Sequence, residues 1–180
     1  MKKKKFFVDM DGVLAIWNPK ATEEETHERG YFIRRDVEFS VVAFVRMLMA
    51  ERYDVSILSS VYQDDHSVKE KESWLDNVGL RDIPRIFVPY GEDKHNYIKV
   101  DDDCLPILID DFSKNLKAWE NEGYLPIKFF NGINNMPKLK VVDGKIEIKL
   151  DTWSGYSIDN RMTPQMMFTV VTGVAEAEAA

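Results

Sequence analysis

Short apolar runs alternate along the chain with longer segments whose apolar residues recur at helical spacing. The apolar runs predict strands at residues 4–8, 55–58, 85–88, 105–109 and 127–130. The helical spacing predicts helices at residues 39–51, 67–78 and 113–122. Strands that alternate with helices form right-handed βαβ units with parallel strands. The pattern therefore predicts an α/β fold in which a central parallel sheet is flanked by helices.

The last part of the chain departs from this alternation. Between Lys138 and Leu150, apolar and polar residues alternate on both sides of Asp143-Gly144, a dipeptide that favours a tight hairpin turn. Thr163-Pro164 predicts the start of a final short helix, and the alanine-rich residues 175–180 are predicted to form a frayed tail. Because no repeat or linker interrupts the sequence, residues 1–180 are predicted to form one domain with a small C-terminal β-hairpin.

Two carboxylates directly follow the first predicted strand. Asp9 and Asp11 come after an apolar run, and Gly12 then lets the chain turn. At a strand-to-loop transition, the first carboxylate can face a bound phosphate while the second reaches the leaving oxygen. Asp9 is therefore a candidate nucleophile that carries a phosphoaspartyl intermediate, and Asp11 a candidate acid and base. Gly12 lies in the same loop and is a candidate substrate-binding residue.

Two later predicted strands end in residues that suit the same chemistry. Ser59 and Ser60 offer hydroxyl and backbone donors to phosphate oxygens, and Asp110 follows the strand at 105–109. Because ligands bind at the carboxyl ends of parallel strands, we expect these residues to converge on one crevice. The carboxylates of Asp9 and Asp110, with a backbone carbonyl such as that of Asp11, are the hard oxygen ligands that Mg²⁺ prefers. These three residues are the predicted metal site.

Together these motifs resemble those of the haloacid dehalogenase phosphohydrolases. The resemblance runs nearly end to end and rests on Asp9-Met10-Asp11-Gly12-Val13-Leu14-Ala15, Ser59-Ser60, a downstream lysine and Ile109-Asp110-Asp111. Within that superfamily the chain is most similar to the cytosolic-type 5'(3')-deoxyribonucleotidases, because the first motif, Gly30-Tyr31-Phe32, Glu70-Lys71 with Trp74, and residues 108–111 recur in that order. The resemblance implies a Rossmann-like core and a Mg²⁺-dependent phosphatase. It assigns Asp9 as nucleophile, Asp11 as acid and base, Ser59 to the phosphate and Asp110 to the metal.

Two lysines are candidates for the cation that neutralises the charge of the nucleophile and the phosphate. Lys71 lies in the predicted helix at 67–78 and matches the family's Glu-Lys pair before a tryptophan, so it is the favoured catalytic lysine. Lys94 lies in a predicted loop ahead of the Asp110 strand and is the alternative, since a loop lysine can reach phosphate as a point charge. The sequence leaves both assignments open.

Substrate choice is expected to reside in residues 16–38, where the family places a small helical cap over the pocket. The interval from Asp11 to Ser59 is shorter than in the mammalian enzymes that the chain resembles, which predicts a reduced cap and leaves the base preference open. Trp17 in this segment and Trp153 on the C-terminal side are candidate contacts to a base or sugar.

The composition of the chain indicates which partners it can bind and in which cellular compartment it is expected. The chain has 180 residues, of which 44% are hydrophobic, enough for one sizeable core. Its net charge of −7 argues against binding to a nucleic-acid polymer, although a metal and a lysine can neutralise one nucleotide phosphate. A single cysteine, Cys104, and the absence of an apolar run of about 20 residues predict a cytoplasmic protein without a membrane partner.

The sequence therefore predicts a phosphoric monoester hydrolase that uses Mg²⁺ and a phosphoaspartyl intermediate to hydrolyse (deoxy)nucleoside monophosphates. One alternative is a phosphatase for another small phosphorylated metabolite, which a reduced cap would admit. The other is a ligand-binding protein without catalysis, since fold alone does not establish activity. The expected partner is a small-molecule phosphomonoester, and homodimerisation is left open.

Overall fold

Six parallel strands form the central sheet of the molecule. The computed structural model describes residues 2–133, 138–142, 145–149 and 153–180. The strand order is β3-β2-β1-β4-β5-β8, and every neighbouring pair is parallel. The strands are β1 (Lys3–Val8), β2 (Asp54–Val61), β3 (Arg85–Pro89), β4 (Cys104–Asp110), β5 (Leu125–Phe130) and β8 (Ser157–Asp159). The predicted α/β fold with a central parallel sheet is confirmed.

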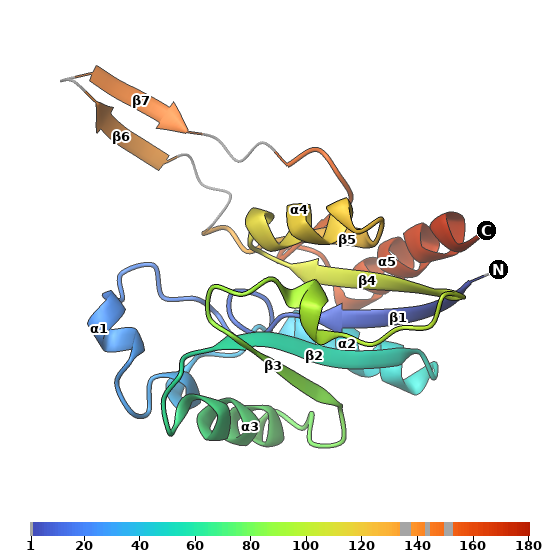
Figure 1. Cartoon of the computed structure of the whole chain (residues 1–180), viewed down its shortest axis with the longest axis horizontal. Coiled ribbons are helices and arrows are strands. Elements are labelled where there is room, and N and C mark those ends of the chain that lie inside the picture. Colours follow the sequence, from blue (N-terminus) through green and yellow to red (C-terminus); the bar gives the residue numbers. More distant parts are fainter. Residues whose placement is uncertain (1, 134–137, 143–144, 150–152) are drawn as a thin grey trace.

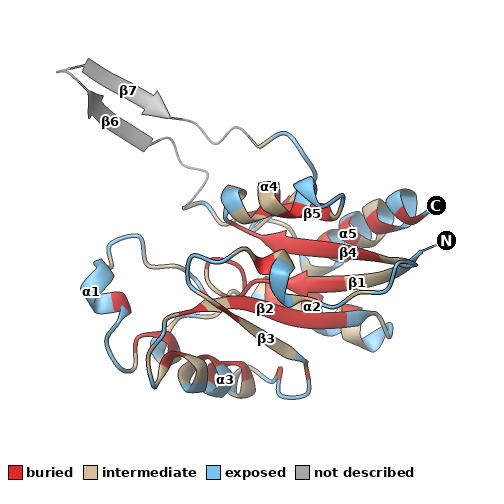
Figure 2. Ribbon diagram, in the orientation of Figure 1, coloured by how far each residue is buried: buried red, intermediate tan, exposed pale blue. Residues whose placement is uncertain are grey.

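The central strands are continuous apolar runs because helices cover both of their faces. Phe6, Phe7 and Val8 of β1 are all fully buried, and in Figure 2 most of β2 and β4 and the carboxyl-terminal half of β1 are red. The register pairs Val8 with Ile57 of β2 and with Ile109 of β4. Residues that follow these positions are therefore brought together at the carboxyl edge of the sheet.

Four helices pack against the two faces of the sheet (Figure 1): α2 (Phe39–Ala50), α3 (Ser67–Asn77), α4 (Ser113–Asn121) and α5 (Pro164–Ala179). The larger core joins one sheet face to side chains of α2, α3 and α5. The smaller core joins the other face to α4, with Phe7 against Trp119 at a ring-centroid distance of 5.5 Å. No helix in residues 2–133 or 153–180 is long and apolar enough to cross a membrane.

The end of α5 corrects one prediction. Residues 175–180 are not a frayed tail, because α5 continues to Ala179 and both Ala175 and Ala179 are buried in the larger core. The backbone N–H of Lys2 donates to the carbonyl of Ala179 at 3.0 Å. Alanine has good helix propensity, and its small side chain lets the helix lie close to the sheet. The short strand β8 was also not predicted.

The predicted C-terminal hairpin is confirmed in its two strands. β6 (Lys138–Val142) and β7 (Lys145–Lys149) pair antiparallel and form a separate two-stranded sheet. The predicted turn at Asp143-Gly144 and residue Leu150 lie outside the described residues.

The segment predicted as a reduced cap, residues 16–38, contains little regular structure. Its elements are α1 (Glu23–Thr26), which begins with a capping box formed by Thr22 and Glu25, and the 3-10 helix η1 (Phe32–Arg34). In Figure 1, α1 lies beyond the ends toward which the arrows of β1 and β4 point. The segment therefore lies at the edge of the sheet where the predicted site residues gather.

The packing of α5 gives a test of stability. Ala175→Glu places a charge in the larger core and should lower the free energy of unfolding by about 3 kcal/mol. Ala177→Glu makes the same change at an exposed position of the same helix and should have little effect. Urea denaturation of both variants measures the difference, and equal stability would mean that the end of α5 does not pack against the sheet.

Candidate active site

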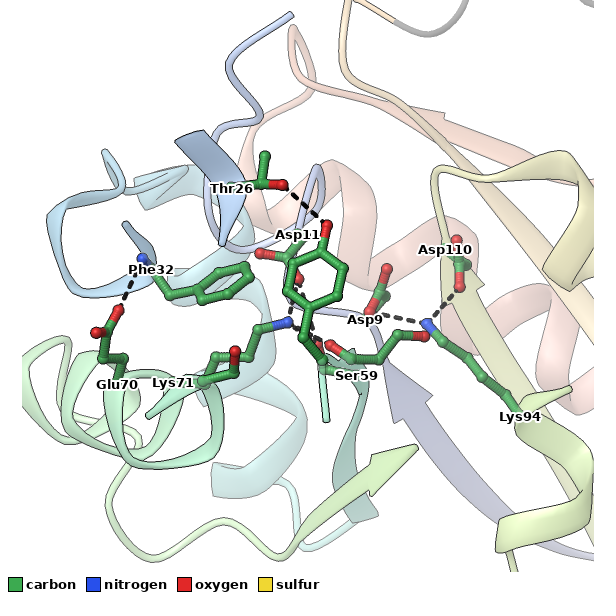
Figure 3. A network of polar contacts seen from close by, with 12 residues as sticks. Asp9, Asp11, Thr26, Phe32, Ser59, Glu70, Lys71, Lys94 and Asp110 are labelled. Carbon is green, nitrogen blue, oxygen red and sulfur yellow. Dashed lines mark hydrogen bonds and ion pairs between the residues drawn. The ribbon is translucent and has the colours of Figure 1, made fainter. Parts of the chain in front are cut away.

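The ends of β1 and β4 place two buried carboxylates around one lysine. Asp9 follows β1, and its N–H donates to the carbonyl of Ile109 at 2.9 Å. Lys94, at the start of the 3-10 helix η2 (Lys94–Tyr97), places its Nζ 2.8 Å from Oδ1 of Asp9 and 2.7 Å from Oδ2 of Asp110. Figure 3 shows the lysine between the two carboxylates. Lys94 is only 2% exposed, so it is no solvated surface charge.

Asp110 is held on both of its oxygens. Its Oδ2 also accepts from Nδ2 of Asn115 at 2.9 Å, and its Oδ1 accepts from the N–H of Phe112 at 2.7 Å. Both donors belong to the first turn of α4 and the residue before it. The start of α4 therefore fixes the orientation of this carboxylate.

A third buried carboxylate, Asp111, lies against the loop that follows Asp9. Gly12 has a φ of +82°, and a Cβ at this position would lie 2.1 Å from Oδ2 of Asp111. Nδ2 of Asn131 donates to that oxygen at 2.8 Å and to the carbonyl of Gly12 at 2.9 Å. The position of Asp111 therefore requires glycine at residue 12, because the backbone there is left-handed and a side chain would collide with the carboxylate.

These three carboxylates can hold a metal ion. Asp9, Asp110 and Asp111 each offer a ligand oxygen, and the three oxygens lie within 4.8 Å of one another. Burial, with the nearby charges of Asp110 and Asp11, raises the pKa of Asp9 to about 7 even though Lys94 opposes the shift. Burial and the same cluster of charges raise the pKa of Asp111 well above its usual value. Three hard oxygens with excess negative charge are a donor set that suits a divalent cation such as Mg²⁺.

Asp111 adds a carboxylate that the sequence analysis did not place among the candidate metal ligands. The carboxylate of Asp11 is instead bound by Lys71. Adjacent acids at a strand end point in different directions, and only the structure shows which of them reach the cluster. The backbone carbonyl of Asp11 as a metal ligand stays a prediction.

The second lysine serves a different carboxylate. Lys71 of α3 is fully buried, and its Nζ forms an ion pair with Oδ2 of Asp11 and donates to the Ser59 hydroxyl at 3.0 Å and to the Ser60 carbonyl. The Ser59 hydroxyl in turn lies 3.4 Å from the same Asp11 oxygen. Ser59 and Ser60 belong to β2 itself, which extends to Val61, and not to a loop after it. The structure thus brings both candidate lysines to the site, Lys94 beside Asp9 and Lys71 beside Asp11.

The charge on Lys94 is stabilised by its partners. Burial alone would lower its pKa, but the carboxylates of Asp110 and Asp9 outweigh burial and raise the pKa above its usual value. Lys94 therefore stays protonated at neutral pH and offsets part of the negative charge of the cluster.

A cavity of about 560 Å³ opens onto these groups. Its polar lining includes Asp9, Asp11, Ser60, Lys71 and Asp111. Its aromatic lining consists of Trp17, Phe32, Tyr62, Tyr90 and Phe112. Trp17 thus lies where a ligand could reach it, while its contact with a base or sugar stays a prediction. The cavity has one charged part and one aromatic part.

Trp153 is not among the residues that line this cavity, and its predicted contact with a base or sugar stays a prediction. Its Nε1 donates to the carbonyl of Tyr156 at 3.0 Å, and its side chain packs against the smaller core. Its neighbours are thus the buried residues on the α4 face of the sheet, because a large aromatic side chain gains more from burial there than from exposure.

Several residues of the site were missed at the level of sequence. Asn115 lies in the first turn of the helix that follows Asp110, and this spacing could have predicted that its side chain reaches the carboxylate. Tyr62 directly follows β2, and Tyr90 directly follows β3, so both occupy the edge where ligands bind. Asn131 follows β5, a strand that carried no functional motif, and the buried Lys128, which donates to the Ser113 hydroxyl at 2.7 Å, lies within that strand. No pattern in the sequence identifies these last two.

Comparisons with known proteins bear on the fold alone. No protein-family model and no curated protein matches the chain. A solved structure described as "Structure of Pnkp1/Rnl/Hen1 complex" is similar, with a TM-score of 0.54 and 19% identity. The match covers 69% of this chain and 45% of that chain, so this chain spans less than half of its length.

The raised pKa of Asp9 predicts how pH affects metal binding. Because Asp9 titrates near pH 7 and only its carboxylate form binds a cation, protons should compete with the metal below that pH. The affinity for Mg²⁺, measured by isothermal titration calorimetry, should be about tenfold weaker at pH 6 than at pH 8. Equal affinities at the two pH values would exclude Asp9 from the ligands.

Proposed function

We propose that this protein is a Mg²⁺-dependent phosphomonoesterase that hydrolyses (deoxy)nucleoside monophosphates through a phosphoaspartyl intermediate. The observation that carries the proposal is the pairing of Asp9 and Asp11 in one cavity with different lysines. Two carboxylates two residues apart have separate environments, which is the arrangement that gives two acids two chemical roles.

In the first step, an oxygen of Asp9 attacks the phosphorus of the substrate. A bond forms between Asp9 and phosphorus, the bond between phosphorus and the alcohol oxygen breaks, and that oxygen takes a proton from Asp11. Lys94 holds the attacking carboxylate in place and remains charged throughout.

In the second step, Asp11 takes a proton from water, and the water oxygen attacks the phosphorus of the aspartyl phosphate. The bond between Asp9 and phosphorus breaks, which releases inorganic phosphate and restores both carboxyl groups. Lys71 and the Ser59 hydroxyl hold Asp11 during both proton transfers.

The carboxylates of Asp9, Asp110 and Asp111 would hold Mg²⁺, which when bound supplies positive charge to the phosphoryl oxygens. Asp110 is prepared for this role because Asn115 and the N–H of Phe112 fix its orientation. Lys94 offsets part of the repulsion between Asp9 and Asp110 before a cation binds.

The aromatic part of the cavity supports a substrate with a planar group. Tyr90 and Phe112 are 70% and 54% exposed, so their ring faces are accessible at the cavity. Aromatic side chains stack on nucleobases with little dependence on which base is bound. The volume of about 560 Å³ lies within the range of small-molecule pockets. A nucleoside monophosphate has a charged phosphate and a planar base, which correspond to the charged part and the aromatic part of the cavity.

The first test is phosphate release in the presence of Mg²⁺ from a panel of deoxy- and ribonucleoside monophosphates and sugar phosphates. Wild type should prefer nucleotides, EDTA should abolish release, and Asp9→Asn should lower kcat by about 10³-fold or more. Equal release from sugar phosphates would favour the phosphatase for another metabolite. No release from any substrate, with nucleotide binding intact, would favour the binding protein.

The two lysines should differ in their effect on turnover. With 4-nitrophenyl phosphate, whose leaving group needs little help from a proton, Lys94→Met should lower kcat/KM more than Lys71→Met, since Lys94 contacts the nucleophile. Melting curves of both variants control for unfolding, because Lys94→Met leaves the buried Asp9 and Asp110 without their cation and Lys71→Met leaves the partly buried Asp11 without its own. The reverse order of activities would give the phosphate-neutralising role to Lys71.

A further inference from the structure

The helix α3 contacts both the catalytic carboxylate Asp11 and the cap segment. Lys71 reaches Asp11, while its neighbours Glu70 and Trp74 bind the backbone of residues 30–35. The carboxylate of Glu70 accepts the N–H groups of Gly30 and Phe32, the latter at 3.1 Å. Nε1 of Trp74, one turn further along the same helix face, donates to the carbonyl of Arg35 at 2.8 Å.

The backbone at Gly30 is shaped for this contact. Gly30 has a φ of +84°, in the left-handed region that glycine adopts without strain. Its conformation turns two nearby N–H groups toward one carboxylate, and such convergent amides favour an anion. Glu70 therefore fixes the position of Phe32 through the main chain.

The side chain of Phe32 meets the lysine that follows Glu70. Nζ of Lys71 lies 4.4 Å from the centroid of the Phe32 ring, which is a cation–π distance. The three N–H groups of an ammonium match the three acceptors of Lys71, namely Asp11, the Ser59 hydroxyl and the Ser60 carbonyl. Phe32 is 3% exposed and Lys71 is fully buried, so the ring covers the ammonium group. Figure 3 shows these groups next to one another, from Glu70 through Phe32 and Lys71 to Asp11.

We propose that Glu70 is a positioning residue for Asp11. It holds the Phe32 ring against the ammonium of Lys71, and the ring keeps that ammonium directed at the carboxylate of Asp11. This inference rests on the proposed function, since it concerns the group that gives a proton to the leaving oxygen. Attack of Asp9 on phosphorus does not depend on it, because Asp9 is held by Lys94.

Glu70→Gln tests the role because the amide keeps the size but can accept well from only one of the two N–H groups. The substrates are aryl phosphates from phenyl phosphate to 4-nitrophenyl phosphate, whose leaving groups need progressively less protonation. For Glu70→Gln, kcat/KM should fall by about 10²-fold for phenyl phosphate and by less than about threefold for 4-nitrophenyl phosphate. Glu72→Gln is the matched control, since it makes the same change at an exposed position of α3.

A purely structural role for Glu70 would lower kcat/KM equally across the series, so a uniform loss, or no loss relative to Glu72→Gln, overturns the proposal. If Glu70→Gln does not fold, Phe32→Leu replaces it, and this variant must show the same dependence on the leaving group. Uniform loss in Phe32→Leu overturns the proposal too. Absence of hydrolysis by the wild type overturns the proposed function itself, whereas an active wild type with uniform loss overturns only the role of Glu70.

Discussion

Repulsion among carboxylates at one edge of the sheet is the constraint on which the site depends. Asp9, Asp110 and Asp111 are all buried, and their mutual charge in a poorly solvated place is costly. Lys94 offsets part of that cost by contact with Asp9 and Asp110. Burial, together with the charges of Asp110 and Asp11, still raises the pKa of Asp9 although Lys94 opposes the shift. A divalent cation is the natural complement of this residual charge.

The parallel sheet explains why much of this arrangement could be predicted from sequence. Apolar runs identify β1, β2 and β4, and the polar residues at or after their ends, Asp9, Ser59 and Asp110, must then share one edge. Strand patterns carry no information on side-chain direction beyond the strand end. For that reason the sequence identified Lys71 and Lys94 as rivals, whereas the structure shows them at different carboxylates.

Features that differ from the sequence-based expectation have physical reasons of the same kind. Trp153 is a candidate contact to a base because aromatic residues can stack on bases, yet its partly buried side chain packs against the smaller core. Residues 175–180 were predicted to fray because chain ends are often poorly ordered, but the small side chains of Ala175 and Ala179 permit close packing against the core. Asn131 and Lys128 act through tertiary contacts that no local spacing encodes.

The two described ends of the chain lie side by side, since Lys2 donates a backbone hydrogen bond to Ala179. In Figure 1 both termini lie at the amino end of β1, whereas the site residues follow its carboxyl end. A fluorophore or an attachment to a solid support placed beside Lys2 or Ala179 would therefore lie away from the cavity. An attachment at this position suits surface-based measurements in which small molecules flow past the immobilised protein.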